Sequence, residues 1–209
     1  MSGEGFFGHK GLGDDTDPVN AREFALRQAL GRVRTNVPVK VVAVHDGGVG
    51  PAGTVDVQVM IKQYNGVGEQ QSHGIIYGIP WSRSQGGGNA IINDPKVDDI
   101  GFISIADRDI SSLKANEGKE SQAGSFRTHD LADGIYNAAM LNPANPDQYV
   151  HFTDTGVTIV SKNGCSVTLD GNNVYVNPAG NVYLGGSSSG GMSKVVTLAG
   201  PSINVYAKV

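Results

Sequence analysis

The side chains that could do acid–base chemistry here are a group of acids near the middle of the chain. The acids are Asp98, Asp99, Asp107 and Asp109, and Arg108 lies between the last two. Two carboxyl groups that face each other across a sugar-sized cleft could serve a glycosidase. The simpler interpretation is an ion pair between Arg108 and a neighbouring aspartate at the end of a strand, and we expect that pairing.

Histidine and cysteine are the other candidates for ligand or nucleophile chemistry. His151 lies between Val150 and Phe152, so the alternation of a strand places it on the face opposite those two apolar residues. Three such imidazoles about a threefold axis could bind a metal or an anion, but we expect an outward surface histidine. Cys165 alternates in register with Val167, which favours a small buried hydrophobe over a reactive thiol.

Two glycine-rich stretches resemble phosphate-binding loops in their glycine content. They are GVGPAG (48–53) and GGGN (86–89). Neither supplies the lysine and the serine or threonine of a P-loop, and neither opens a helix. We expect ordinary turns, and no Ser/His/Asp order or metal quartet stands out elsewhere. The sequence therefore predicts a protein that is not an enzyme and needs no cofactor.

Composition narrows the class of protein further. The chain has 209 residues, of which 17% are charged and 30 are glycine. The glycines separate short apolar runs, as is typical of all-β proteins. A net charge of −4 argues against a nucleic-acid partner, which would require a basic surface. With one cysteine, no intrachain disulfide is expected, and with no apparent signal peptide or membrane span we expect synthesis in the cytoplasm without the usual export.

A helix is predicted near the N-terminus. Asp17 and Pro18 match an N-cap and the first helical position. Leu26, Leu30 and Val33 continue at helical spacing. The apolar stripe is narrow, so this helix needs a partner surface to persist.

Residues 33–110 are predicted to form an OB-like, partly open β-barrel. Apolar alternation predicts strands over 37–44, 55–61, 74–80 and 99–106, with a long turn at 45–53 and a hairpin tip at 84–89. Within the second strand Asp56 and Gln58 alternate with valines, so we expect them on the wet face. Trp81 follows the third strand, and we expect it to fill one end of the barrel. Residues 111–149 are polar and rich in glycine, asparagine and proline, which predicts an extended connector with a short turn around Leu131–Ala139.

From Val150 onward the chain consists of short segments in which apolar residues alternate with other residues, and turns separate these alternating segments. The predicted core residues are Val157, Ile159, Cys165, Val167, Leu169, Val174, Val176, Val182 and Leu184. So few apolar residues in roughly 60 cannot offset the chain entropy of a lone segment. Three copies wound about one axis would pool them into a shared core. We expect an intertwined trimeric β-helix, and a monomeric sandwich is the alternative that the same pattern allows.

Four segments in a fixed order carry a resemblance to a known family. They are IKQYNGV (61–67), YGIPW (77–81), VDDIGFISIADRDI (97–110) and RTHDLADGIYNAAML (127–141). Together with the alternating segments from Val150 onward, they resemble phage baseplate assembly protein V and related membrane-puncturing central spikes of contractile tails, over about residues 33–186. The resemblance implies a homotrimer, an OB-fold collar on the baseplate hub proteins, and a needle that transiently crosses the bacterial outer membrane. It places the protein at the tail tip of the virion, after synthesis in the host cytoplasm.

The chain departs from some members of that family at its end. Those members hold an iron ion through a His-x-His pair, but the histidines here are His9, His45, His73, His129 and His151. No tip metal is therefore expected.

The expected organisation is an all-β protein with a short N-terminal helix. Its parts are an arm and helix at 1–32, the OB-fold barrel at 33–110, the connector at 111–149, the triple-stranded β-helix at 150–186 and a C-terminal tip at 187–209. Two other functions fit the same pattern: a carbohydrate-binding OB-fold module and a spike of a secretion system.

Overall fold

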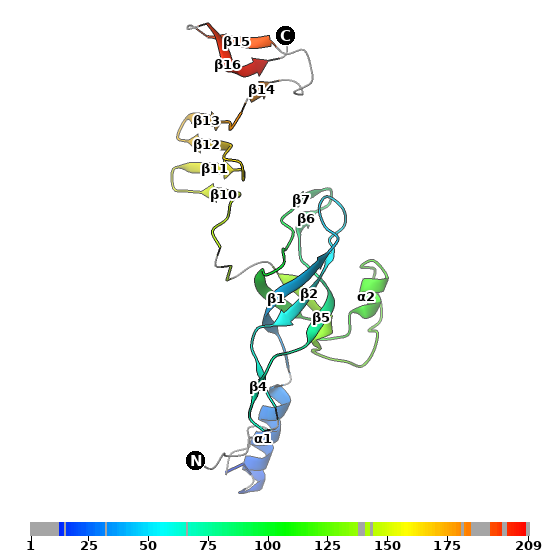
Figure 1. The fold of residues 1–209 in the computed structure, drawn as a ribbon. Coiled ribbons are helices and arrows are strands. Elements are labelled where there is room, and N and C mark those ends of the chain that lie inside the picture. Colours follow the sequence, from blue (N-terminus) through cyan, green and yellow to red (C-terminus); the bar gives the residue numbers. More distant parts are fainter. Residues whose placement is uncertain are drawn as a thin grey trace. The chain divides into compact units, whose positions relative to one another are not determined.

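The computed structural model describes residues 13–14, 16–31, 33–65, 67–137, 141–142, 144–180, 182–184, 193–197 and 200–207. The chain divides into two compact units, Met1–Pro143 (unit 1) and Ala144–Val209 (unit 2). Figure 1 traces the elements of both units. The described residues are mostly in strands with few helical turns, which confirms the expected all-β class.

Unit 1 begins with the predicted helix, α1 (Pro18–Leu30). The Asp17 carboxylate caps it by accepting hydrogen bonds from the backbone N–H groups of Val19 and Asn20, at 2.7 and 3.1 Å. Gly31 ends it by donating its N–H to the Arg27 carbonyl at 2.9 Å. None of its residues is buried, so packing within the chain contributes little to its stability.

A five-stranded antiparallel sheet forms the body of unit 1. Its strands, in spatial order, are β5 (Ile75–Pro80), β2 (Thr54–Val59), β1 (Asn36–His45), β8 (Ile100–Ile105) and β9 (Gly134–Asn137). Among its described residues, unit 1 also has two small hairpins and two short helices: β3 (Gln63–Tyr64) with β4 (Gln70–Gln71), β6 (Ser84–Gly86) with β7 (Asn89–Ile91), α2 (Ser111–Ala115) and the 3-10 turn η1 (Leu131–Asp133). Of the five strands expected within 33–110, the four that alternation locates appear as β1, β2, β5 and β8, whereas the fifth strand of the sheet, β9, lies outside that range.

The two outer strands of this sheet approach each other at one point. Trp81, directly after β5, forms a parallel bridge with Tyr136 of β9. The next backbone N–H, of Ser82, donates to the Tyr136 carbonyl at 2.8 Å. The sheet therefore curves far enough for its first and last strands to touch.

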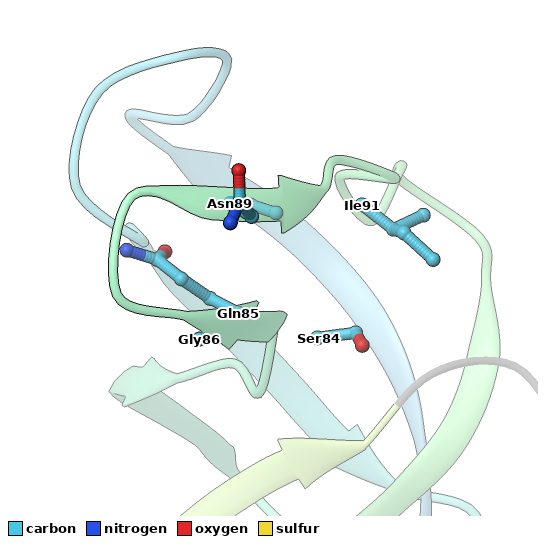
Figure 2. Close-up of a pocket in the computed structure, with 6 residues that line it drawn as sticks. Ser84, Gln85, Gly86, Asn89 and Ile91 are labelled. Atoms are coloured by element: carbon cyan, nitrogen blue, oxygen red, sulfur yellow. The ribbon is translucent and has the colours of Figure 1, made fainter.

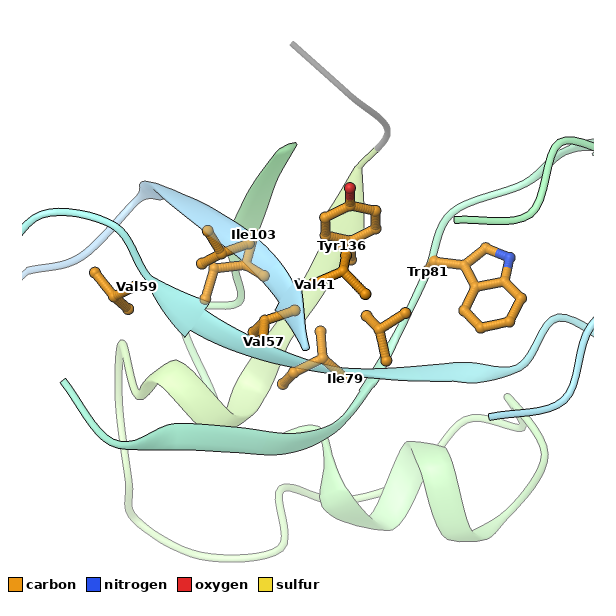
Figure 3. Close-up of a cluster of buried hydrophobic side chains, with 9 residues drawn as sticks. Val41, Val57, Val59, Ile79, Trp81, Ile103 and Tyr136 are labelled. Carbon is orange, nitrogen blue, oxygen red and sulfur yellow. The ribbon is translucent and has the colours of Figure 1, made fainter. Parts of the chain in front are cut away.

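The core of unit 1 lies inside this curve (Figure 3). Its buried side chains are Val39, Val41, Val55, Val57, Val59, Ile79, Trp81, Ile103 and Tyr136. Trp81 is 5% exposed and belongs to this core; that it fills one end of a barrel stays a prediction. A side chain at Gly53 would place its Cβ 2.6 Å from the Trp81 ring, so glycine is required where the indole crosses this loop.

Two expectations for unit 1 differ from the structure. Alternation predicts that Asp56 lies on the solvent-facing side of β2, but Asp56 is buried. The reason is that the register of β2 shifts against both β1 and β5 around this residue. Composition predicts a connector over 111–149, but Gly134–Asn137 joins the sheet as β9 beside β8. The end of the predicted turn around Leu131–Ala139 lies outside the described residues.

The described residues of unit 2 form two separate sheets. The first is an antiparallel meander of β10 (Tyr149–Phe152), β11 (Gly156–Val160), β12 (Ser166–Asp170) and β13 (Asn173–Asn177). The second has the order β14 (Val182–Leu184), β16 (Gly200–Ala207) and β15 (Ser193–Thr197), with β14 parallel to β16. The predicted needle, 150–186, is thus divided, because β14 pairs with the C-terminal strands.

Tight turns hold the meander in register. A Cβ at Gly156 would lie 1.8 Å from the Leu169 carbonyl oxygen, so only glycine lets β11 start beside β12. Gly164 and Gly171 have φ angles of 85° and 55°, the left-handed region that favours glycine at turns.

Candidate functional site

One face of the β10–β13 sheet is entirely apolar. Residues paired across antiparallel strands share a face, as do residues two apart on one strand. The first ladder is Val150–Ile159–Val167–Val176, and the second is Phe152–Val157–Leu169–Val174. We call these eight residues the apolar face.

No part of unit 2 that the structure describes covers this face. None of the residues of β10–β13, all of which are described, is buried. Phe152 is 74% exposed, Val174 64% and Val167 37%. Eight such side chains would contribute on the order of 8 kcal/mol per chain if a partner removed them from water. A contiguous apolar surface of this kind marks an interaction site.

The opposite face of the same sheet is mostly polar. Its central ladder is His151–Thr158–Thr168–Tyr175. His151 therefore points away from the apolar face, as predicted, and its ring meets the Tyr149 ring edge-on at 6.5 Å between centroids. The sheet has one face suited to water and one suited to a core.

The structure brings most of the predicted core residues together. Val157, Ile159, Val167, Leu169, Val174 and Val176 all lie on the apolar face. Cys165 directly precedes β12 and is exposed, with its sulfur accepting the Ala179 N–H at 3.1 Å. It lines an open depression of about 530 Å³ that also contains Val182. The side chain of Leu184 lies outside the described residues.

The acids near the middle of the sequence do not converge on a cleft. Asp98 and Asp99 precede β8, whereas Asp107 and Asp109 follow it, so a strand of six residues separates the two pairs by about 20 Å. The carboxyl groups of a glycosidase stand within about 10 Å of each other. Asp98 forms an ion pair with Lys40 at 3.1 Å, and this arrangement does not support paired-carboxylate chemistry.

Asp109 belongs to a buried network of charges that sequence reasoning missed. The expected partner Arg108 is exposed, and Arg127 takes its place, with an Nη2–Oδ1 distance of 3.0 Å. Arg127 also contacts Asp133, which is 1% exposed, through Nε at 2.8 Å and Nη2 at 2.9 Å. Hydrogen bonding to Asp133 raises the pKa of the Arg127 guanidinium above its ordinary value. The network anchors both ends of the segment 109–133 and is structural.

This network should make unit 1 sensitive to acid. Hydrogen bonds from Ser111 and Ser125, aided by the charge of Arg127, hold the pKa of the Asp109 carboxyl well below its ordinary value. A carboxyl whose pKa is lowered by folding stabilises the fold above about pH 4 and loses that contribution as the pH falls towards its folded pKa. We expect Asp109→Asn to lower the melting temperature at neutral pH and to reduce its fall below about pH 4.

Melting temperatures measured from neutral pH down to about pH 2 would check this prediction. Asp107→Asn is the matched control, because Asp107 is an exposed neighbour. Parallel pH profiles for Asp109→Asn and the unmodified chain would contradict it.

A second buried acid, Asp56, stabilises the bulged region of the sheet. Its Oδ2 lies 2.9 Å from Nε2 of His45, and its Oδ1 accepts the Gly78 N–H at 3.0 Å. The hydrogen bond with His45 is the main reason that the pKa of Asp56 is lowered. Both carboxylate oxygens are engaged in joining β1, β2 and β5, so the pair explains why an acid can be buried there.

Two further depressions lie among the described residues of unit 1. One follows the β6–β7 hairpin, where Figure 2 shows Gln85 and Asn89 on the two strands. Its lining contains no titratable side chain. Another, between the 45–53 loop and this hairpin, contains Arg83, which donates to the Gly50 carbonyl at 2.7 Å. These contacts fix loops.

The chain matches no protein-family model, and no curated protein shows significant similarity to it. Among the described residues, no three or more of His, Cys, Asp and Glu gather where they could hold a metal ion. Searched over the same residues, the helices include none with the length and apolarity needed to cross a membrane.

Proposed function

We propose that this chain is the trimeric central spike of a contractile phage tail, a structural protein that pierces the bacterial envelope. The observation that carries the proposal is the apolar face of the β10–β13 sheet, which the described residues of unit 2 leave uncovered. A sheet with one apolar face must bury that face against another structural element. Two further copies of the same sheet would do so, with the polar faces outward.

The dimensions of the sheet support three copies. A strand of five residues, such as β11, is about 17 Å long. Three walls of that width form a triangular prism in which each wall lies about 5 Å from the axis, half the roughly 10 Å spacing of packed sheets. Side chains such as Val167 and Leu169 would then meet at the axis without leaving a channel.

The architecture of unit 1 supports the collar of such a spike. Five strands with long loops, and the contact between Trp81 and Tyr136, are consistent with an OB-like barrel. In the proposed assembly this collar docks on the baseplate hub proteins, while the needle crosses the outer membrane transiently. Sheath contraction supplies the energy, so the spike acts without catalysis or a cofactor and has no nucleic-acid partner.

The load-carrying role follows from how such a needle would break. Each sheet is held by antiparallel ladders such as Val157↔Leu169 and Val167↔Val176. In a trimer with a shared core, one chain cannot separate without exposing the apolar faces of all three. Axial force is therefore distributed over many hydrogen bonds and contacts at once.

The oligomeric state is the first test. We expect mass photometry and sedimentation of the full chain to give three times the 21.8 kDa of one chain, down to the lowest measurable concentration. Negative-stain averages should show a narrow needle on a wider base. A mass of one chain at all concentrations, or of two, would overturn the proposal.

A further inference from the structure

Helix α1 has an apolar stripe that the rest of the described chain does not cover. Val19, Leu26 and Leu30 are 63%, 59% and 60% exposed. Because successive helical residues are about 100° apart, these three fall within a narrow band on one side of the helix. The partly buried residues Phe24 and Gln28 lie on the other side. The helix is thus oriented with its apolar stripe towards solvent.

A helix of this kind requires a partner. Isolated helices shorter than about 12–15 residues are marginal in water. α1 has 13 residues and none of them is buried. Its capping by Asp17 fixes where it starts but does not supply an apolar contact for the stripe.

The charges beside the stripe indicate which partner fits. On the helical wheel Glu23 borders the stripe on one side and Arg22 borders it on the other, and both are exposed. Arg27 lies further round on the side of Glu23 and is paired with Asp14. The two borders of the stripe therefore carry opposite charges.

Opposite borders favour parallel packing of identical helices. When copies are related by rotation about an axis along the helices, the left border of each helix meets the right border of the next, so Arg22 faces Glu23. In an antiparallel pair each border would meet its own copy, and like charges would be opposed. Charges beside an apolar seam set orientation in this way in helical assemblies.

We propose that α1 packs in parallel against α1 of two further copies, with Val19, Leu26 and Leu30 at a common axis. The inference rests on the proposed trimer and names a second role in its assembly: the N-terminal helices form an additional intersubunit contact. A hub protein bound to the same apolar stripe is the competing occupant, and the following test separates the two.

Cysteine cross-linking of the full chain tests the orientation. In a Cys165→Ser background, Val19→Cys and Leu30→Cys are each oxidised and examined by non-reducing electrophoresis. A disulfide needs Cα atoms within about 7 Å. In the parallel arrangement each variant forms same-residue disulfides, linking at most two of the three chains of a trimer. In an antiparallel pair the same residues would be about 16 Å apart at both ends.

Ala21→Cys is the matched control, because Ala21 is exposed on the far side of the same helix and should remain uncross-linked. A trimer mass without disulfides at either stripe position would overturn the role of α1 and leave the proposed spike intact. Disulfides at both positions in a chain that never reaches a trimer mass would show parallel pairing of α1 but overturn both its three-copy packing and the spike. Emission of the buried Trp81 verifies that each variant has folded.

Discussion

Val167→Asp should abolish the trimer and leave unit 1 folded. Val167 lies in the middle of the apolar face, paired with Ile159 on one side and Val176 on the other. In the proposed prism three carboxylates would meet near the axis without counter-ions, and burying each costs several kcal/mol. Association should therefore weaken by more than about a thousandfold.

Two measurements on this variant separate assembly from folding. Mass photometry should give the mass of one chain. The emission of Trp81, the only tryptophan in the chain, should be unchanged, because that ring is buried in unit 1.

Thr168→Asp is the control for Val167→Asp. Thr168 is the next residue on the same strand, but its ladder partners Thr158 and Tyr175 place it on the polar face. The same charge there should remain in water, and the trimer should persist. Trimers of Val167→Asp, or equal dissociation of both variants, would mean that the apolar face is not the shared core.

Gly101→Ala should destabilise unit 1 by about 3 kcal/mol, the upper part of the usual range for overpacking. A Cβ at Gly101 would lie 2.4 Å from the Asn137 carbonyl oxygen and 2.7 Å from the Tyr136 hydroxyl. Both atoms belong to β9, and the Asn137 oxygen is a backbone atom. Strand β9 therefore cannot move aside without a large cost in free energy. The Tyr136 ring is already confined, since the residue is 2% exposed; the same burial raises the pKa of its phenol to about 12.

Urea unfolding followed by Trp81 emission measures this effect. The midpoint should fall by about 1 M or more. Gly74→Ala is the control, because a Cβ at Gly74 meets nothing within 4 Å and should change stability by no more than about 0.5 kcal/mol. If the two variants unfold at the same urea concentration, β9 does not pack against β8 as described.

Local patterns are enough to predict much of this protein. Asp17 and Pro18 locate the start of α1, since capping depends on neighbours in the chain. The alternation of apolar residues in 150–176 predicts which side chains share a face, because strand geometry has a period of two. The apolar face therefore follows from the order of the amino acids alone, whereas its trimeric use stays a prediction.

Distant pairings could not be derived in the same way. The short run Gly134–Asn137 has little alternation of its own and becomes a strand because the edge of β8 accepts it. Arg127 pairs with Asp109 although 18 positions separate them in the chain. The prediction that the adjacent Arg108 forms an ion pair with an aspartate there was wrong for Asp109. Asp56 looks solvent-facing by period, but the bulge against β5 turns it towards the Gly78 N–H.

The amino-acid sequence by itself determined the class of fold, the N-terminal helix and the two-faced character of strands β10–β13, because each depends on residues within one or two turns or strands. Only the tertiary structure decided that β9 completes the first sheet, that β14 pairs with β16, and that Arg127 forms ion pairs with two buried acids. Those features depend on which distant segments meet in space. Long-range burial and charge pairing leave no repeating pattern along the sequence from which they could be predicted.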